Sequence, residues 1–109
     1  MKFTTTGRGF AITKFQDRND IGCSLQKSSI ATEDCIWLGV DDAQPVIMAR
    51  DAIRLGLKPV EGGEKDNGWV PFPVPQEVLM HTRMHLTRQQ AKELAEALTY
   101  FADNGELPE

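Results

Sequence analysis

The chain has 109 residues, of which 40% are hydrophobic and 26% charged, a composition typical of one globular domain. Its formal net charge of −4 argues against non-specific binding along a DNA backbone, which needs clustered lysine and arginine. Met1-Lys2-Phe3-Thr4 is followed by polar residues rather than by an apolar run, and the sequence has no apolar run of about 18 residues. We therefore expect a soluble cytoplasmic protein without a signal peptide or a membrane span.

The N-terminal part of the chain predicts a β-hairpin. Residues 1–9 are expected to form a loose or edge segment before a single domain that covers residues 10–109. Residues 10–16 are rich in Phe, Ile and Thr, which are strand-forming residues, and residues 23–29 alternate between apolar and polar side chains. Residues 17–22, between them, have the composition of a turn.

The middle of the chain predicts further strands and one short helix. Residues 35–40 are apolar throughout, which is typical of a central strand covered on both faces. Residues 45–48 indicate a short strand, and residues 49–55 indicate one or two helical turns. Gly56 is expected to end that helix in a left-handed conformation, and residues 58–68 then form a long loop.

The C-terminal part is the most strongly patterned. Residues 78–86 alternate strictly and predict a strand. Thr87 and Gln90 form a capping box at the start of a helix over residues 88–103, which carries an apolar stripe. The fold class is therefore α+β: an antiparallel sheet of about five strands, a short helix near 49–55, and a C-terminal amphipathic helix packed on one face.

The strand over residues 78–86 also presents the main candidate binding surface. His81, Arg83 and His85 share one face of it, and Arg88 lies in the first turn of the following helix. Guanidinium, imidazole and a helix N-terminus together suit a phosphate or a carboxylate. Lys27, on the other face of the hairpin strand, is a further candidate. The alternative is a strand face that only contacts solvent.

The two histidines do not predict a metal site or a catalytic pair. Four residues of a strand span roughly 13 Å, so His81 and His85 cannot share one zinc ion. We expect no metal and no cofactor. His85-Leu86-Thr87 matches the His-x-Thr element of two-histidine phosphoesterases, which need two such elements for acid and base catalysis. We therefore expect a protein that is not an enzyme, with a phosphoesterase that uses His85 as the alternative.

Tryptophans and cysteines complete the candidate residues. Trp37, among apolar neighbours, is expected in the core. Trp69 follows the loop over 58–68 and precedes three prolines, where it either packs on that loop or anchors an interface. Cys23 and Cys35 are expected to be free thiols, unless their strands are neighbours with the geometry of a disulfide.

Four segments resemble those of small proteins encoded in tailed-phage and prophage genomes: C-S-L-Q-K-S-S at 23–29, E-D-C-I-W-L-G at 33–39, G-W-V-P at 68–71 and T-R-M-H-L-T at 82–87. The resemblance extends over most of the chain from residue 15 to residue 107. It implies a phage origin and action in the cytoplasm of the infected bacterium. It brings no catalytic residues with it.

By analogy with other small acidic phage proteins, we expect an accessory protein that binds a host component. Such a protein can inhibit host defence, by occupying a host protein or by sequestering a nucleotide signal. The expected partner is therefore a host bacterial protein or a small phosphorylated ligand. A virion or assembly component is the alternative. Homo-oligomers are expected, because a small sheet leaves strand edges that can pair.

Overall fold

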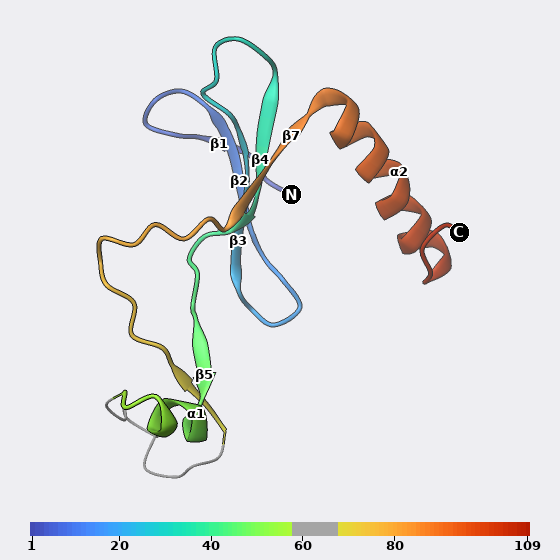
Figure 1. Cartoon of the computed structure of the whole chain (residues 1–109). Coiled ribbons are helices and arrows are strands. Elements are labelled where there is room, and N and C mark those ends of the chain that lie inside the picture. The colour runs from blue at the N-terminus through green and yellow to red at the C-terminus, as the bar shows by residue number, and fades with distance from the viewer. Residues whose placement is uncertain (58–67) are drawn as a thin grey trace. The chain divides into compact units, whose positions relative to one another are not determined.

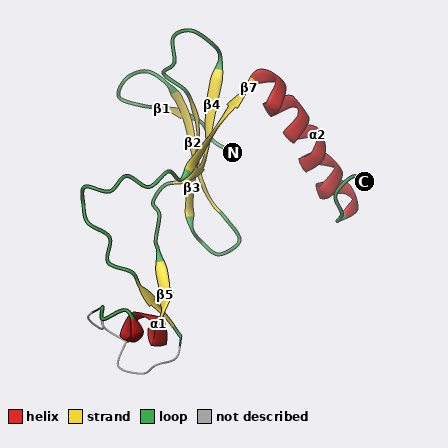
Figure 2. Cartoon of the chain, viewed as in Figure 1, coloured by secondary structure: helices red, strands yellow, loops and turns green. Residues whose placement is uncertain are grey.

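The computed structural model describes residues 1–57 and 68–109, which form two compact units. The first unit contains Met1–Asp41 and Thr82–Glu109, and the second is Asp42–His81. A five-stranded antiparallel sheet, a short helix and a C-terminal helix make the fold α+β, as predicted (Figures 1 and 2). The predicted loop over 58–68 lies outside the described residues, apart from Gly68.

The sheet of the first unit has the strand order β1-β2-β3-β4-β7, and every neighbouring pair is antiparallel. Its strands are β1 (Thr4–Thr5), β2 (Ala11–Gln16), β3 (Gly22–Lys27), β4 (Cys35–Val40) and β7 (Arg83–Thr87). The hairpin of β2 and β3 confirms the prediction for residues 10–29. In its turn, a side-chain oxygen of Asp17 accepts hydrogen bonds from the backbone N–H groups of Asn19 and Ile21, at 2.7 and 3.0 Å.

Strand register divides this sheet into a polar face and an apolar face, because directly paired residues share a face and successive residues alternate. The polar face carries Lys14, Ser24, Trp37, Gly39, Arg83 and His85. The apolar face carries Phe15, Cys23, Leu25, Ile36, Leu38, Val40, Met84 and Leu86. The alternation predicted for the C-terminal strand therefore holds from Arg83 onward.

The predicted strand over 78–86 is longer than the strand in the structure. β7 begins at Arg83, which pairs with Gly39 of β4. β4 itself ends at Val40, so residues before Arg83 have almost no length of β4 left to pair with. Alternating side chains alone do not make a strand where a partner strand is missing.

The second unit combines β5 (Val46–Met48), α1 (Ala49–Arg54) and β6 (Trp69–Pro71), and β5 pairs antiparallel with β6. This confirms the short strand and the short helix that the sequence predicts. Its core consists of Ala49, Ala52 and Val70, with Ile47 and Leu57 packed against them. Gly56 follows α1 with a φ of 75°, the left-handed conformation expected of a helix-ending glycine.

The C-terminal helix, α2 (Arg88–Asn104), is fixed at both ends by its sequence. The Thr87 hydroxyl accepts a hydrogen bond from the Gln90 backbone N–H, and the Gln90 side chain accepts one from the Thr87 backbone N–H. Gly105 ends the helix with a φ of 75° and donates to the carbonyl of Phe101. None of the residues of α2 is buried, so the structure does not show the predicted packing of this helix on a sheet face.

Candidate functional site

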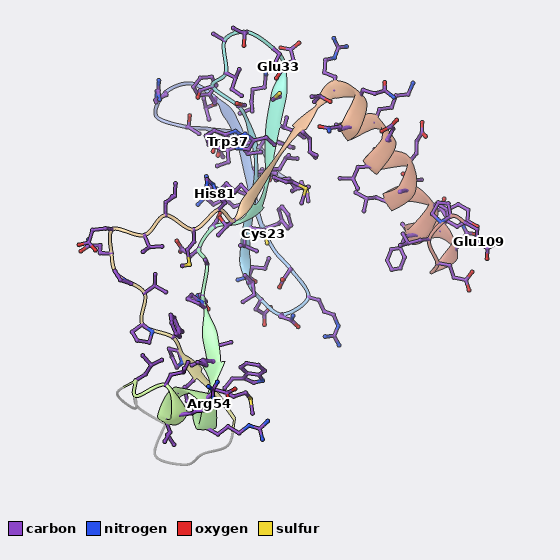
Figure 3. All side chains as sticks on the ribbon, viewed as in Figure 1. Cys23, Glu33, Trp37, Arg54, His81 and Glu109 are labelled. Carbon is purple, nitrogen blue, oxygen red and sulfur yellow. The ribbon has the colours of Figure 1, made fainter. Side chains whose placement is uncertain are left out.

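The polar face of the sheet is centred on a pair of stacked rings. Trp37 of β4 lies directly opposite His85 of β7, and their ring centroids are 5.4 Å apart with an interplanar angle of 15°. His85 is exposed and Trp37 is half-buried. The prediction of a core position for Trp37 is therefore wrong: the strand register puts its ring on the polar face, stacked against the imidazole of His85. Figure 3 labels Trp37 on the sheet of the first unit.

Arg83 extends this stack along the same strand. The carbon at the centre of its guanidinium group lies 5.8 Å from the centroid of the Trp37 ring, a cation–π distance. A terminal nitrogen of the same guanidinium group, Nη2, lies 3.5 Å from a carboxylate oxygen of Asp41. Trp37, His85 and Arg83 thus form one continuous surface of planar groups, which we call the stacking surface.

Asp41 balances part of the positive charge on this face. Its carboxylate accepts a hydrogen bond from the Ser24 hydroxyl and forms ion pairs with Arg83 and with Lys14, whose Nζ lies 3.8 Å away. The Ser24 hydrogen bond is the main cause that lowers the pKa of Asp41, and the charges of Lys14 and Arg83 act in the same direction, against the effect of burial. Asp41 is therefore ionised at neutral pH.

Two donors on the polar face lack partners. Trp37 Nε1 and Arg83 Nε are buried and form no hydrogen bond with any described residue. Each such unpaired donor costs about 1–3 kcal/mol. These two unpaired N–H groups therefore lower the stability of the fold, whereas the side chains of Lys14, Ser24 and Asp41 have partners.

The other predicted site residues belong to different elements from the stacking surface. His81 lies in the second unit and precedes β7, so it does not continue the row of Arg83 and His85. Trp69, in β6 of the second unit, is 68% exposed. Lys27 and Arg88 both lie on the opposite, apolar side of the sheet, where they line a hollow.

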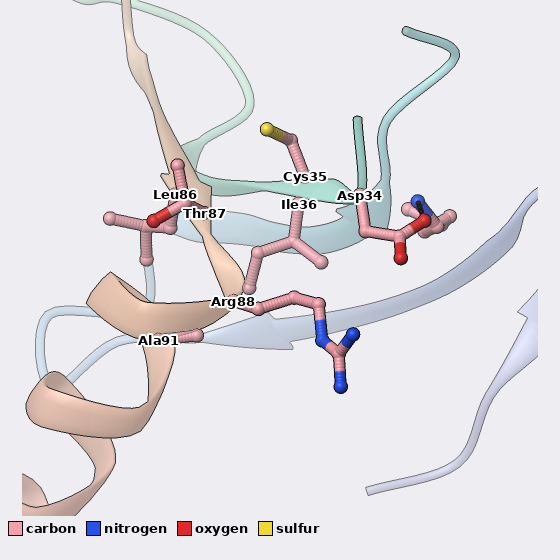
Figure 4. Close-up of a pocket in the computed structure, with 8 residues that line it drawn as sticks. Asp34, Cys35, Ile36, Leu86, Thr87, Arg88 and Ala91 are labelled. Carbon is pink, nitrogen blue, oxygen red and sulfur yellow. Dashed lines mark hydrogen bonds and ion pairs between the residues drawn. The ribbon is translucent and has the colours of Figure 1, made fainter. Parts of the chain in front are cut away.

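This hollow has a volume of about 360 Å³ and lies where α2 leaves β7 (Figure 4). Ile36 and Leu86, which pair across β4 and β7, form its floor together with Ala91 of α2. Lys27 and Asp34 form an ion pair of 3.5 Å at its rim. Most of the surface that lines the hollow is apolar, which suits an apolar side chain better than an anion. The lining residues are Lys27, Asp34, Cys35, Ile36, Leu86, Thr87, Arg88 and Ala91.

Both cysteines are buried and free. Cys23 lies on the apolar face, whereas Cys35 has the strand parity of Trp37 and points to the other side of β4 from Ile36 (Figure 4). Their strands are neighbours, but this geometry does not allow a disulfide. Burial raises the pKa of the Cys35 thiol, and the Glu33 carboxylate raises it further.

Alkylation of Cys35 by iodoacetamide at pH 7.5 is expected to be at least about tenfold slower in the native protein than in urea, because the reactive thiolate is disfavoured and buried. Mass spectrometry of peptides after timed labelling measures this rate, with glutathione as the reference thiol. The rate should rise with pH above neutrality. Labelling of native Cys35 at the rate of the unfolded chain would contradict the burial and the raised pKa.

No three His, Cys, Asp or Glu side chains within the described part of the chain come close enough to hold a metal ion. Within the same residues, no helix is long and apolar enough to cross a membrane. Comparison with protein-family models, with curated proteins and with solved structures gives no match to the chain. The fold and site therefore define a small α+β protein with a stacking surface on its sheet.

Trp37 and Asp41 are residues of the polar face that the sequence pattern does not predict. Each acts through a partner on another strand, Trp37 through His85 and Asp41 through Ser24 and Arg83. The alternation of side chains along the strands gives a signal for Trp37. Trp37 and Gly39 alternate with the apolar residues of β4, as Arg83 and His85 alternate with those of β7. Only the pairing of β4 with β7 brings these two patterns together.

Proposed function

We propose that the protein is a phage accessory protein that binds a small phosphorylated ligand in the cytoplasm of the infected bacterium, without catalysing a reaction. The observation that carries this proposal is the stacking surface of Trp37, His85 and Arg83. Exposed planar rings bind nucleobases by stacking, which contributes about 1–3 kcal/mol per base. The phage origin rests on the sequence resemblance described above.

The charges around the stacking surface favour a nucleotide over a simple anion. Lys14 is 71% exposed at its side chain, and Arg83 is about one-third exposed, so both can approach a phosphate. Asp41 neutralises part of this charge and repels a bare anion. A ligand that gains affinity from stacking on His85, and adds a phosphate contact, fits this balance better. A nucleotide signal, sequestered from a host defence pathway, is such a ligand.

The surroundings of His85 support binding more than catalysis. Its imidazole stacks on Trp37, and within the described part of the chain no carboxylate or second histidine forms a hydrogen bond with it. A catalytic histidine normally has a partner that orients it, and a two-histidine phosphoesterase needs a second histidine. The stacking arrangement uses the flat face of the ring instead.

The test is binding of the full chain to a panel of mononucleotides and cyclic dinucleotides, measured by thermal shift and by titration calorimetry. At least one nucleotide is expected to raise the melting temperature. Replacing His85 with Ala should weaken its binding about 10- to 100-fold, because a stacking partner is lost. Met84→Ala is the matched control, because Met84 is the neighbouring residue of β7 and lies on the apolar face.

Either of two results would contradict this proposal. One is that no nucleotide in the panel binds the wild-type chain. The other is that His85→Ala and Met84→Ala bind the same nucleotide equally well. If the panel fails and a host protein instead co-purifies from infected cells, the partner belongs to the other class expected from the sequence.

A further inference from the structure

An apolar stripe along α2 is half-buried at its N-terminal end and exposed at its C-terminal end. Ala91, Leu94, Leu98 and Phe101 follow one another at intervals of three, four and three residues, the spacing of a coiled-coil seam. Leu98 is 54% exposed and Phe101 52% exposed. A helix of this kind derives most of its stability from covering such a stripe, so the exposed stripe indicates a partner.

The hollow beside β7 lies at the N-terminal end of the same stripe. Ala91, the first residue of the stripe, lines this hollow together with Ile36 and Leu86. The large side chain of the stripe, Phe101, is ten residues further along the same helix, or about 15 Å. A rigid helix cannot bring its own Phe101 back to Ala91, but another copy of the chain can supply one.

We propose that a second copy of the chain covers the stripe, with the two α2 helices packed antiparallel and Phe101 of each copy seated in the hollow beside Ala91 of the other. In this arrangement Leu94 faces Leu98, and the small Ala91 faces the large Phe101, so every layer has a similar volume. A parallel pair would instead stack two alanines at one end and two phenylalanines at the other.

The distribution of charge along α2 also favours the antiparallel arrangement. Arg88 and Lys92 lie near its start, whereas Asp103, Glu106 and Glu109 lie at or beyond its end. The first turn contains no acidic residue and the last turn no basic one. This distribution opposes the preference of the helix dipole and is unfavourable in an isolated helix. Two antiparallel copies bring the basic end of each helix to the acidic end of the other.

The residues beside the stripe permit a close approach of two helices. Ala95, Ala97 and Ala102 flank it, and they place neither charge nor bulk against a neighbour. A single helix pair is nevertheless a small interface, and small interfaces are typically weak. We therefore expect a two-fold symmetric dimer with a dissociation constant on the order of 1–10 µM. This inference does not depend on the ligand proposed for the polar face.

Sedimentation equilibrium of the full chain tests the proposal. The mass is expected to rise with concentration from 12.2 kDa, the mass of one chain, towards twice that value. Replacing Phe101 with Ser should raise the dissociation constant about 10- to 100-fold, since one large apolar side chain per copy no longer enters the hollow. Tyr100→Ser is the matched control, because Tyr100 is also exposed, at 43%, but lies off the stripe. Circular dichroism checks that the helix persists.

Charge reversal tests the orientation of the helices. The double variant Arg88→Glu/Lys92→Glu should weaken the dimer, and adding Asp103→Lys/Glu106→Lys should restore it. A parallel pair predicts no such rescue, because like charges would meet at both ends in every variant. A monomer at every concentration, or a dimer that Phe101→Ser leaves unchanged, would overturn the proposal. Nucleotide binding is also measured for Phe101→Ser. A monomeric Phe101→Ser variant that still binds a nucleotide would show that the dimer proposal and the ligand proposal can fail independently.

Discussion

Replacing Gly39 with alanine is expected to lower the free energy of unfolding by about 3 kcal/mol. Gly39 of β4 pairs with Arg83 of β7, and the two backbones are unusually close there. A Cβ at Gly39 would overlap the carbonyl oxygen of Thr82 and lie 2.7 Å from the Cα of Arg83. These are backbone atoms, so the clash is relieved only if β7 moves away from β4.

The matched control for this substitution is Gly7→Ala. A Cβ at Gly7 meets no atom within 4 Å, and its backbone is not in the left-handed region. Its effect is expected to stay within about 0.5 kcal/mol. Urea denaturation followed by tryptophan fluorescence measures both variants. Gly39→Ala should also abolish nucleotide binding, because a displaced β7 carries Arg83 and His85 away from Trp37. A Gly39→Ala protein as stable as Gly7→Ala would contradict the close approach.

The elements that the sequence predicted well are those with strong local signals. The strand over residues 35–40 agrees residue for residue with β4, and the hairpin strands agree to within one or two residues. The start of α2 is fixed by Thr87 and Gln90, whose reciprocal hydrogen bonds involve only neighbouring residues. Such interactions need no knowledge of the rest of the fold.

The elements that it predicted less well depend on partners distant in the chain. The strand predicted over residues 78–86 is longer than β7, because β4 pairs with no residue before Arg83. The position of α2 cannot be predicted from its apolar stripe. The stripe indicates that an apolar surface covers it, but not whether that surface belongs to the sheet or to another chain. The same limit applies to Trp37: its apolar neighbours in sequence indicated a core position, and its neighbours across the sheet place it under His85.

The candidate site shows the same division between local and distant information. Strand parity correctly placed Arg83 and His85 on one face, whereas Lys27, a candidate for the same binding surface, lies on the opposite face. Parity could not reveal that the charge of Arg83 is already paired, because Asp41 reaches it from the end of β4. The polar face is therefore a stacking surface whose charge is partly neutralised, and not the cationic face that the sequence predicts.

Replacing Asp41 with Asn is expected to lower the free energy of unfolding by about 2 kcal/mol at pH 7, since a carboxylate that accepts from Ser24 and pairs with Lys14 and Arg83 is lost. Asp42→Asn, at the exposed neighbouring residue, is the control and should change stability by less than about 0.5 kcal/mol. Urea denaturation at a series of pH values between pH 7 and pH 2.5 measures both variants and the wild type.

The pH dependence of this difference has a definite sign. The pKa of Asp41 is lowered from its ordinary value of 3.8, so the unfolded chain takes up a proton at this residue before the folded chain does. The contribution of Asp41 is therefore complete above pH 3.8 and is lost as the pH falls through the lower pKa of the folded state. The wild type should exceed Asp41→Asn in stability at pH 7 and approach it in acid. A difference that stays constant, or grows, as the pH falls would show that the cluster around Asp41 does not stabilise its ionised form.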